Sequence, residues 1–105
     1  MQSAFSADIV LKRIVLQENV EPTDNVNLIV TIDNDGDEVK DSSLKVYIPD
    51  LGVRKSKIIS KLKSQEAANL NFVIPEDANP GYYVMKVVYY NDGFRKVKHR
   101  EILIN

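Results

Sequence analysis

The chain has 105 residues, of which 14 are Lys or Arg and 15 are Asp or Glu, and its net charge is −1. This length suits one domain with one hydrophobic core over residues 1–105, and the balanced charge argues against nucleic acid as a partner. No apolar run reaches the roughly 18 residues that cross a bilayer, so we expect no membrane insertion, and the absence of cysteine excludes disulfides and thiolate chemistry.

The first residues carry no clear targeting signal. Residues 1–7 contain neither the basic region nor the apolar region of a signal peptide. Ala4-Phe5-Ser6 has the small residues of a cleavage site. We therefore expect residues 1–7 to be disordered or to be the remnant of a leader.

Alternating apolar and polar residues, interrupted by turn signals, predict the first three strands. The first strand covers Ile9 to Leu16. In the second, Val26 to Ile32, the even-numbered residues are aliphatic and are expected to face the core. The segment Asn34-Asp35-Gly36-Asp37 then reverses the chain, because Asp-Gly favours tight turns. The third strand has its inward residues between Leu44 and Ile48 and ends at Pro49-Asp50-Leu51-Gly52.

The middle of the chain predicts two further strands. Val53 to Lys63 is rich in lysine, which deters edge-to-edge pairing and indicates an edge strand. The residues from Ile58 to Leu70 also fit a helical stripe, which is the alternative for this segment. Leu70, Phe72 and Ile74 form the next inward set, and Pro75 stops it.

The last two strands are expected to form a hairpin. The run from Tyr82 to Tyr90 is followed by the turn signal Asn91-Asp92-Gly93 and by a returning strand from Phe94 to Ile104. The alternation in the returning strand changes phase between Val97 and Ile102, which predicts a β-bulge there.

Two segments resemble the CARDB-type domains. Val30-Thr31-Ile32-Asp33-Asn34-Asp35-Gly36-Asp37 is similar to the V-x-N-x-G strand and turn of that family. Val73-Ile74-Pro75-Glu76-Asp77-Ala78-Asn79-Pro80-Gly81-Tyr82-Tyr83-Val84 is similar to its v-P-x-d-a-x-P-G-x-Y-x-v entry into the sixth strand. The resemblance runs from Asp8 to Ile104. It implies an all-β, immunoglobulin-like sandwich of seven strands, in A-B-E and C′-C-F-G sheets, as found in prokaryotic surface and S-layer proteins.

Residues that could carry catalysis are scarce. His99 is the single histidine, and it lies within the alternating charges of Lys96 to Glu101, as expected for an exposed strand. The four glycines are isolated, so no glycine-rich phosphate loop is present. We expect no enzyme activity, no catalytic residue and no cofactor.

An acidic turn is the one candidate for metal binding. Asp33, Asp35 and Asp37, followed by Glu38, place carboxylates at alternate positions, and carboxylate oxygens suit calcium. However, the glycine is the fourth residue of this segment rather than the sixth, and no glutamate follows at EF-hand spacing. A solvated turn is therefore the favoured interpretation, with calcium as the alternative.

The outward residues of two neighbouring strands form a candidate contact face. If Tyr83, Met85, Val87 and Tyr89 point inward, the alternate residues of that strand and of the third strand point outward. The predicted partner-contact face consists of Lys45, Tyr47, Val84, Lys86, Val88 and Tyr90. Exposed apolar and aromatic patches often mark contact sites, although such residues also favour strands in general.

Basic residues cluster from Arg54 to Lys63 and from Arg95 to Arg100. Solubility is the simpler explanation, and binding to an acidic glycan or to an acidic protein face is the functional one.

We expect a non-catalytic structural or adhesive module of a prokaryotic, archaeal, cell-surface or S-layer-like protein, acting outside the cell through protein–protein contacts. One alternative is a subunit of a self-assembling surface filament, joined through open strand edges. The other is an accessory domain of a secreted carbohydrate-active enzyme that binds glycan through Tyr47 and Tyr90. A cytoplasmic location is the alternative compartment.

Overall fold

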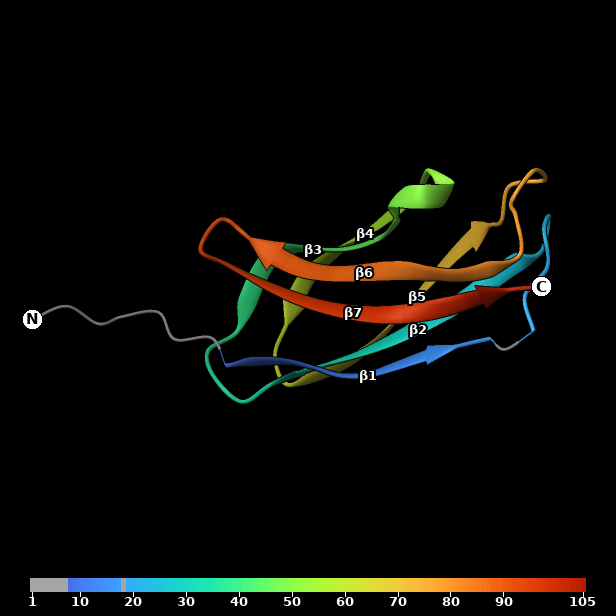
Figure 1. Cartoon of the computed structure of the whole chain (residues 1–105). Helices are drawn as coiled ribbons and strands as arrows, with labels where there is room; N and C mark the ends of the chain where they lie inside the picture. Colours follow the sequence, from blue (N-terminus) through green and yellow to red (C-terminus); the bar gives the residue numbers. More distant parts are fainter. Residues whose placement is uncertain (1–7, 18) are drawn as a thin grey trace, which may run out of the picture.

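The structure, a computed structural model, describes residues 8–17 and 19–105 as two packed β-sheets (Figure 1). The expectation for residues 1–7 lies outside the described residues. The elements are β1 (Ile9–Leu16), β2 (Asn25–Asn34), β3 (Val39–Ile48), the single-turn 3₁₀-helix η1 (Pro49–Leu51), β4 (Val53–Leu62), β5 (Gln65–Val73), β6 (Gly81–Asn91) and β7 (Phe94–Ile104).

The strand order confirms the predicted immunoglobulin-like sandwich. One sheet has the order β1-β2-β5 and the other β4-β3-β6-β7, and their ladders are antiparallel. These orders correspond to the A-B-E and C′-C-F-G sheets. The lysine-rich β4 is an edge strand, as expected, and the helical alternative for Ile58 to Leu70 is wrong, because β4 and β5 occupy that segment.

The core lies between the sheets and follows the predicted alternation. Val26, Leu28, Val30 and Ile32 of β2 are buried, and so are the inward residues of β3, β5 and β6. Leu28, Phe72 and Val87 belong to one hydrophobic cluster, although they come from three strands and both sheets. Burial of aliphatic side chains is worth about 1.5–3 kcal/mol each, and it is the main term that holds this disulfide-free domain together.

A β-bulge is present, but not where the sequence predicted it. The pairing of β7 with β6 runs without a register shift from Gly81↔Ile104 to Asn91↔Phe94, so the bulge predicted between Val97 and Ile102 is wrong. The register shift lies instead in β1, between Leu11 and Arg13.

The polar inward positions of β7 have another cause, which is its place at the sheet edge. The ammonium of Lys98 donates a hydrogen bond of 3.0 Å to the Leu11 carbonyl beside the β1 bulge. Lys98 therefore closes the open side of the sandwich between β1 and β7, where a core residue would be only partly covered.

A buried hydroxyl pair joins β6 to the irregular part of β3. Asp41 has a left-handed φ of 52°, and both Val39 and Ser42, on either side of it, are buried. The Tyr89 hydroxyl donates to Ser42 Oγ at 2.8 Å, and Ser42 Oγ donates to the Ile59 carbonyl at 2.9 Å. These two hydrogen bonds give a partner to the hydroxyl of Tyr89, which is the largest fully buried side chain in the core.

The two family-like segments each contain an anchoring side chain. The buried amide of Asn34 holds the β2–β3 turn, accepting from the Gly36 N–H at 2.9 Å and donating to the Asp37 carbonyl at 2.8 Å. The Tyr83 hydroxyl donates to the Asn79 carbonyl at 2.7 Å, as expected for a tyrosine at the start of this strand. The Tyr83 ring is only half-buried, packed against the rim of the core.

Candidate contact surface

Cross-strand pairing arranges the outer face of the β4-β3-β6-β7 sheet into rows. One row is Arg54–Tyr47–Lys86–His99, the next is Ser56–Lys45–Val88–Val97, and the third is Ile58–Ser43–Tyr90–Arg95. Directly opposite residues in such ladders have Cβ atoms about 4.5–5.5 Å apart, so their side chains interact. We call Lys45, Tyr47, Arg54, Lys86, Tyr90 and Arg95 the basic half of this face.

Two of the cations of the basic half lie over aromatic rings. The Lys45 ammonium is 5.2 Å from the centroid of the Tyr90 ring, and the Arg54 guanidinium is 5.9 Å from the centroid of the Tyr47 ring. A hydrogen bond to the Tyr90 phenol, with the charge of nearby Tyr47, raises the pKa of Lys45. The same hydrogen bond with Lys45 lowers the pKa of Tyr90. The aromatic residues therefore hold the cations in place on the sheet.

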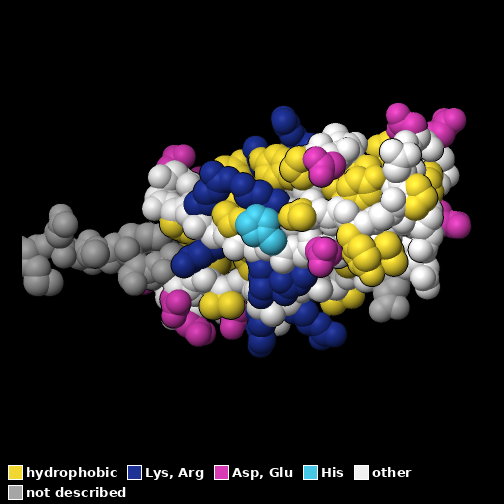
Figure 2. All heavy atoms as spheres, in the orientation of Figure 1, with side chains coloured by type: hydrophobic (Ala, Val, Ile, Leu, Met, Phe, Trp, Pro, Cys, Tyr) yellow, Lys and Arg dark blue, Asp and Glu magenta, His cyan; other side chains and the backbone are white. Residues whose placement is uncertain are grey.

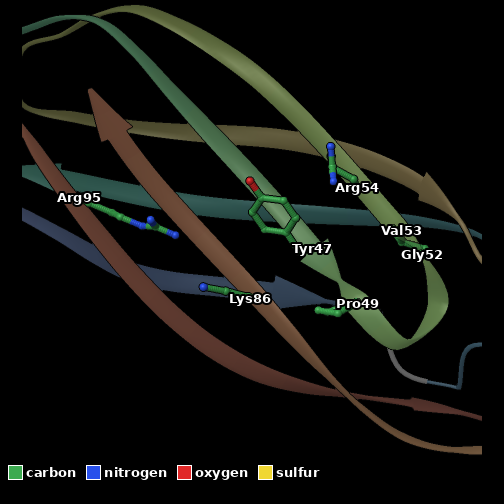
Figure 3. A pocket seen from close by; sticks show the side chains of 7 residues that line it. All are labelled: Tyr47, Pro49, Gly52, Val53, Arg54, Lys86 and Arg95. Atoms are coloured by element: carbon green, nitrogen blue, oxygen red, sulfur yellow. The ribbon is translucent and has the colours of Figure 1, made fainter. Parts of the chain in front are cut away.

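Two hollows open on the basic half, and Tyr47 and Arg95 line both of them. The larger hollow, of about 440 Å³, is also bounded by Arg54, Lys86 and the turn that contains Pro49 (Figure 3). In Figure 3 the Tyr47 ring lies between Arg54 and Lys86. The smaller hollow, of about 290 Å³, is lined by the residues around Tyr90. The described residues that line the two hollows include no carboxylate.

The C-terminal end of β7 borders an apolar part of the same face. Tyr82 and Val84 of β6 are 71% and 53% exposed, and Leu103 pairs with Tyr82 across the strand. We call Tyr82, Val84 and Leu103 the apolar half. Glu101 of β7, paired with Val84, is the acidic residue beside it. In Figure 2 the larger hydrophobic groups lie to the right of the histidine, whereas Lys and Arg lie to its left and below it.

The structure corrects one predicted contact residue. Lys45, Tyr47, Lys86 and Tyr90 are partly exposed and Val84 is exposed, but Val88 is 2% exposed, so its predicted exposure is wrong. Its outward direction follows the ladder as expected. However, a short β-branched side chain on an inner strand is covered by its neighbours, here Lys45 on β3 and Val97 on β7.

Sequence reasoning missed Arg54 and Arg95 as members of this face. Both lie in the basic clusters of the sequence. Counting residues outward from the β3–β4 turn and from the β6–β7 turn would have placed each of them opposite a tyrosine of this face. Arg54 pairs with Tyr47 across η1, and Arg95 pairs with Tyr90 across the Asn91 turn. Asn91 Oδ1 fixes that turn by accepting from the backbone N–H groups of Gly93 and Phe94.

The structure places the residues of the acidic turn in different environments. Asp35 and Asp37 are exposed and Asp33 is half-buried, while Asn34 between them binds the backbone. Within residues 8–17 and 19–105, no three His, Asp or Glu side chains are grouped so that they could hold a metal ion. In the described part of the chain, no helix has both the length and the hydropathy needed to span a membrane.

Comparison with known proteins agrees with this architecture. The crystal structure of Spo0M, a sporulation control protein from Bacillus subtilis, is similar, with a TM-score of 0.60 and 15% sequence identity. The match covers 94% of this chain but 49% of the Spo0M chain, so the present chain spans about half the length of that protein. The likeness at this identity concerns the fold. The search of curated proteins found no match.

The family comparison gives the clearest assignment. The CARDB family model matches residues 6–97, which include both segments whose resemblance was noted in the sequence. Residues 98–104 of β7 lie beyond the matched range. The fold, the strand order and this match agree: the chain belongs to the CARDB family of immunoglobulin-like domains.

Proposed function

We propose that this domain is a non-catalytic module of a prokaryotic cell-surface protein, and that it binds another protein through the outer face of the β4-β3-β6-β7 sheet. The observation that carries this proposal is the exposure of Tyr82 and Val84 beside the basic half on one continuous sheet face. A central apolar area with aromatic residues and arginine is typical of protein interfaces.

Membership of the CARDB family supports the non-catalytic role, because the family consists of immunoglobulin-like domains without catalytic function. Such domains occur in surface and extracellular proteins, which supports a location outside the cell. The archaeal and S-layer assignments belong to the same proposal and depend on the surface location.

The outer face of the opposite sheet has a different character. Its paired residues include Asn27 with Asn71 and Ile29 with Asn69, and its exposed apolar side chains are the aliphatic Val10, Val15 and Val73. Residues that dominate binding energy are enriched in tyrosine and arginine, whereas valine is under-represented among them, and the β4-β3-β6-β7 face combines Tyr47, Tyr82 and Tyr90 with Arg54 and Arg95. This difference favours the β4-β3-β6-β7 face as the contact surface.

A photo-cross-linking experiment in the cells that produce the protein tests the proposal. A benzoylphenylalanine residue is placed at Val84, and in a matched control at Asn71, which is exposed on the opposite sheet. We expect a discrete cross-linked protein from position 84 and none from position 71, with the chain accessible to a membrane-impermeant biotin reagent on intact cells. Equal cross-linking from both positions, or a chain protected from the reagent, would contradict the proposal.

A further inference from the structure

We propose that the basic half receives an acidic segment of the protein partner, whose carboxylates enter the two hollows around Tyr47 while its apolar residues cover Val84 and Tyr82. This inference rests on the contact face proposed above and names the chemistry of its partner.

The cations of the basic half lack acidic partners within the described chain. Among the described residues an ion pair joins Lys61 to Glu38 at 3.9 Å, at the far end of β4 and outside the basic half. Arg54, Lys86 and Arg95 converge on one hollow, and no carboxylate lines it. Grouping like charges on a sheet raises the free energy of the isolated domain, and a bound carboxylate would relieve that repulsion.

The geometry suits a carboxylate in particular. Arg54 and Lys86 flank Tyr47 in a single row, so a group above the Tyr47 hydroxyl is within reach of a guanidinium and an ammonium. Guanidinium groups bind carboxylates through paired N–H donors, and the phenol adds a further O–H donor. Because Arg95 lines both hollows, two carboxylates of one segment can share it.

Sugar binding fits this surface less well. Carbohydrate recognition through tyrosine needs a free ring face, but Arg54 lies over the Tyr47 ring and Lys45 lies over the Tyr90 ring. A sulfated polysaccharide could satisfy the charges, but it has no aliphatic groups to cover Tyr82, Val84 and Leu103. A protein segment provides carboxylates and apolar side chains in one chain, and this combination favours it.

The test uses the purified domain and a synthetic peptide, Glu-Glu-Asp-Glu-Leu-Val-Phe. A second peptide carries Gln and Asn in place of the acidic residues, and heparin is a separate probe. Binding is followed by ¹H–¹⁵N NMR titration. We expect the acidic peptide to shift the amide signals of Tyr47, Lys86 and Val84, the neutral peptide to shift none, and the affinity to fall with added salt.

Two double variants separate this site from general charge attraction. Arg54→Ser with Lys86→Ser removes two cations from the hollow, whereas Lys55→Ser with Lys57→Ser removes two exposed cations that pair with the inward Val46 and Leu44. We expect the first variant to weaken peptide binding at least about tenfold, and the second by less than about twofold. Unchanged NMR spectra away from the substitutions establish that both variants fold.

Four results would overturn the proposal. Equal losses in both variants would show non-specific attraction. Binding of heparin without binding of the acidic peptide would assign the site to a glycan. Sedimentation showing self-association that Arg54→Ser with Lys86→Ser abolishes would make a second copy of this chain the occupant. If Val84 still cross-links its cellular partner in that variant as strongly as before, the contact face stands and the acidic segment is excluded.

Discussion

Replacing Asn34 by alanine is expected to destabilise the domain by about 2–3 kcal/mol, because one buried amide holds three parts of the chain together. Asn34 is 3% exposed. Its Nδ2 donates to the Asp37 carbonyl at 2.8 Å and to the Leu62 carbonyl at 3.3 Å, and its Oδ1 accepts from Gly36 and, at 3.4 Å, from Asp8. The amide therefore links the end of β2 to the following turn, to the end of β4 and to the start of β1.

The magnitude follows from these bonds. Each of the two short hydrogen bonds contributes about 1 kcal/mol, and the two long ones contribute less. Water can replace the amide at the exposed turn, but the Leu62 carbonyl lies at a buried contact and would lose a partner. A loss of 2–3 kcal/mol in a domain of this size lowers Tm by about 10–20 °C.

Urea unfolding followed by circular dichroism measures the change, with Asn69→Ala as the control, since Asn69 is exposed on β5. The control should change stability by less than about 0.5 kcal/mol. The variant Asn34→Asp gives a second test, in which the direction of a pH effect on stability is measured. It keeps the acceptor but turns a carboxylate oxygen toward two carbonyls, so the pKa of the new carboxyl should rise above its ordinary value in the folded state. The folded state then binds the proton more tightly, and the variant should regain stability as the pH falls.

The role assigned to Asn34 is wrong if Asn34→Ala unfolds within about 0.5 kcal/mol of the wild type. It is also wrong if acidification stabilises Asn34→Asp no more than Asn34→Ala. In either case the turn would be held by its backbone alone.

Three further predictions concern single contacts. Tyr89→Phe should cost about 1 kcal/mol in urea unfolding, whereas Ser42→Ala should cost about 1–3 kcal/mol, because it leaves the buried Tyr89 hydroxyl without a partner; the reverse order would refute this account. Lys45→Met should raise the pKa of Tyr90, followed by NMR titration of its ring signals, because the hydrogen bond that lowers this pKa is removed. Gly52→Ala should lower the free energy of unfolding by about 1 kcal/mol, because alanine disfavours the left-handed φ of 65°. An added Cβ meets no atom within 4 Å, so no clash adds to this cost, and Gly52→Asn should cost less.

Alternation of apolar and polar residues predicted the inward side chains correctly in strands that the opposite sheet covers along their whole length. In β2 every second residue from Val26 to Ile32 is aliphatic, because the opposite sheet covers its whole length. In β7 the same positions include Lys96 and Lys98, because this strand lies at the edge and its middle is only partly covered. A change in the pattern therefore indicated a sheet edge, and it was interpreted as a bulge.

The contact face was predictable in direction but not in exposure. The alternation of side chains along β6 placed Val84 and Val88 on the same side of the strand, yet Val84 is 53% exposed and Val88 is buried. The difference depends on the neighbours. Val88 lies between Lys45 and Val97, whereas Val84 lies nearer the strand end, beside Glu101. Such lateral cover depends on strand order and register, which no single strand reveals by itself.

Two short turns create the chemistry of the basic half, because they set which residues lie opposite each other. The η1 turn pairs Tyr47 with Arg54, and the Asn91 turn pairs Tyr90 with Arg95. A register slip of one residue across η1 would place Lys55 opposite Tyr47 and turn every side chain of β4 to the other face. The guanidinium over the Tyr47 ring would be lost, although no residue of the face had changed. Turn length, which is set by Pro49 and the left-handed Gly52, is thus as much a determinant of this surface as the residues on it.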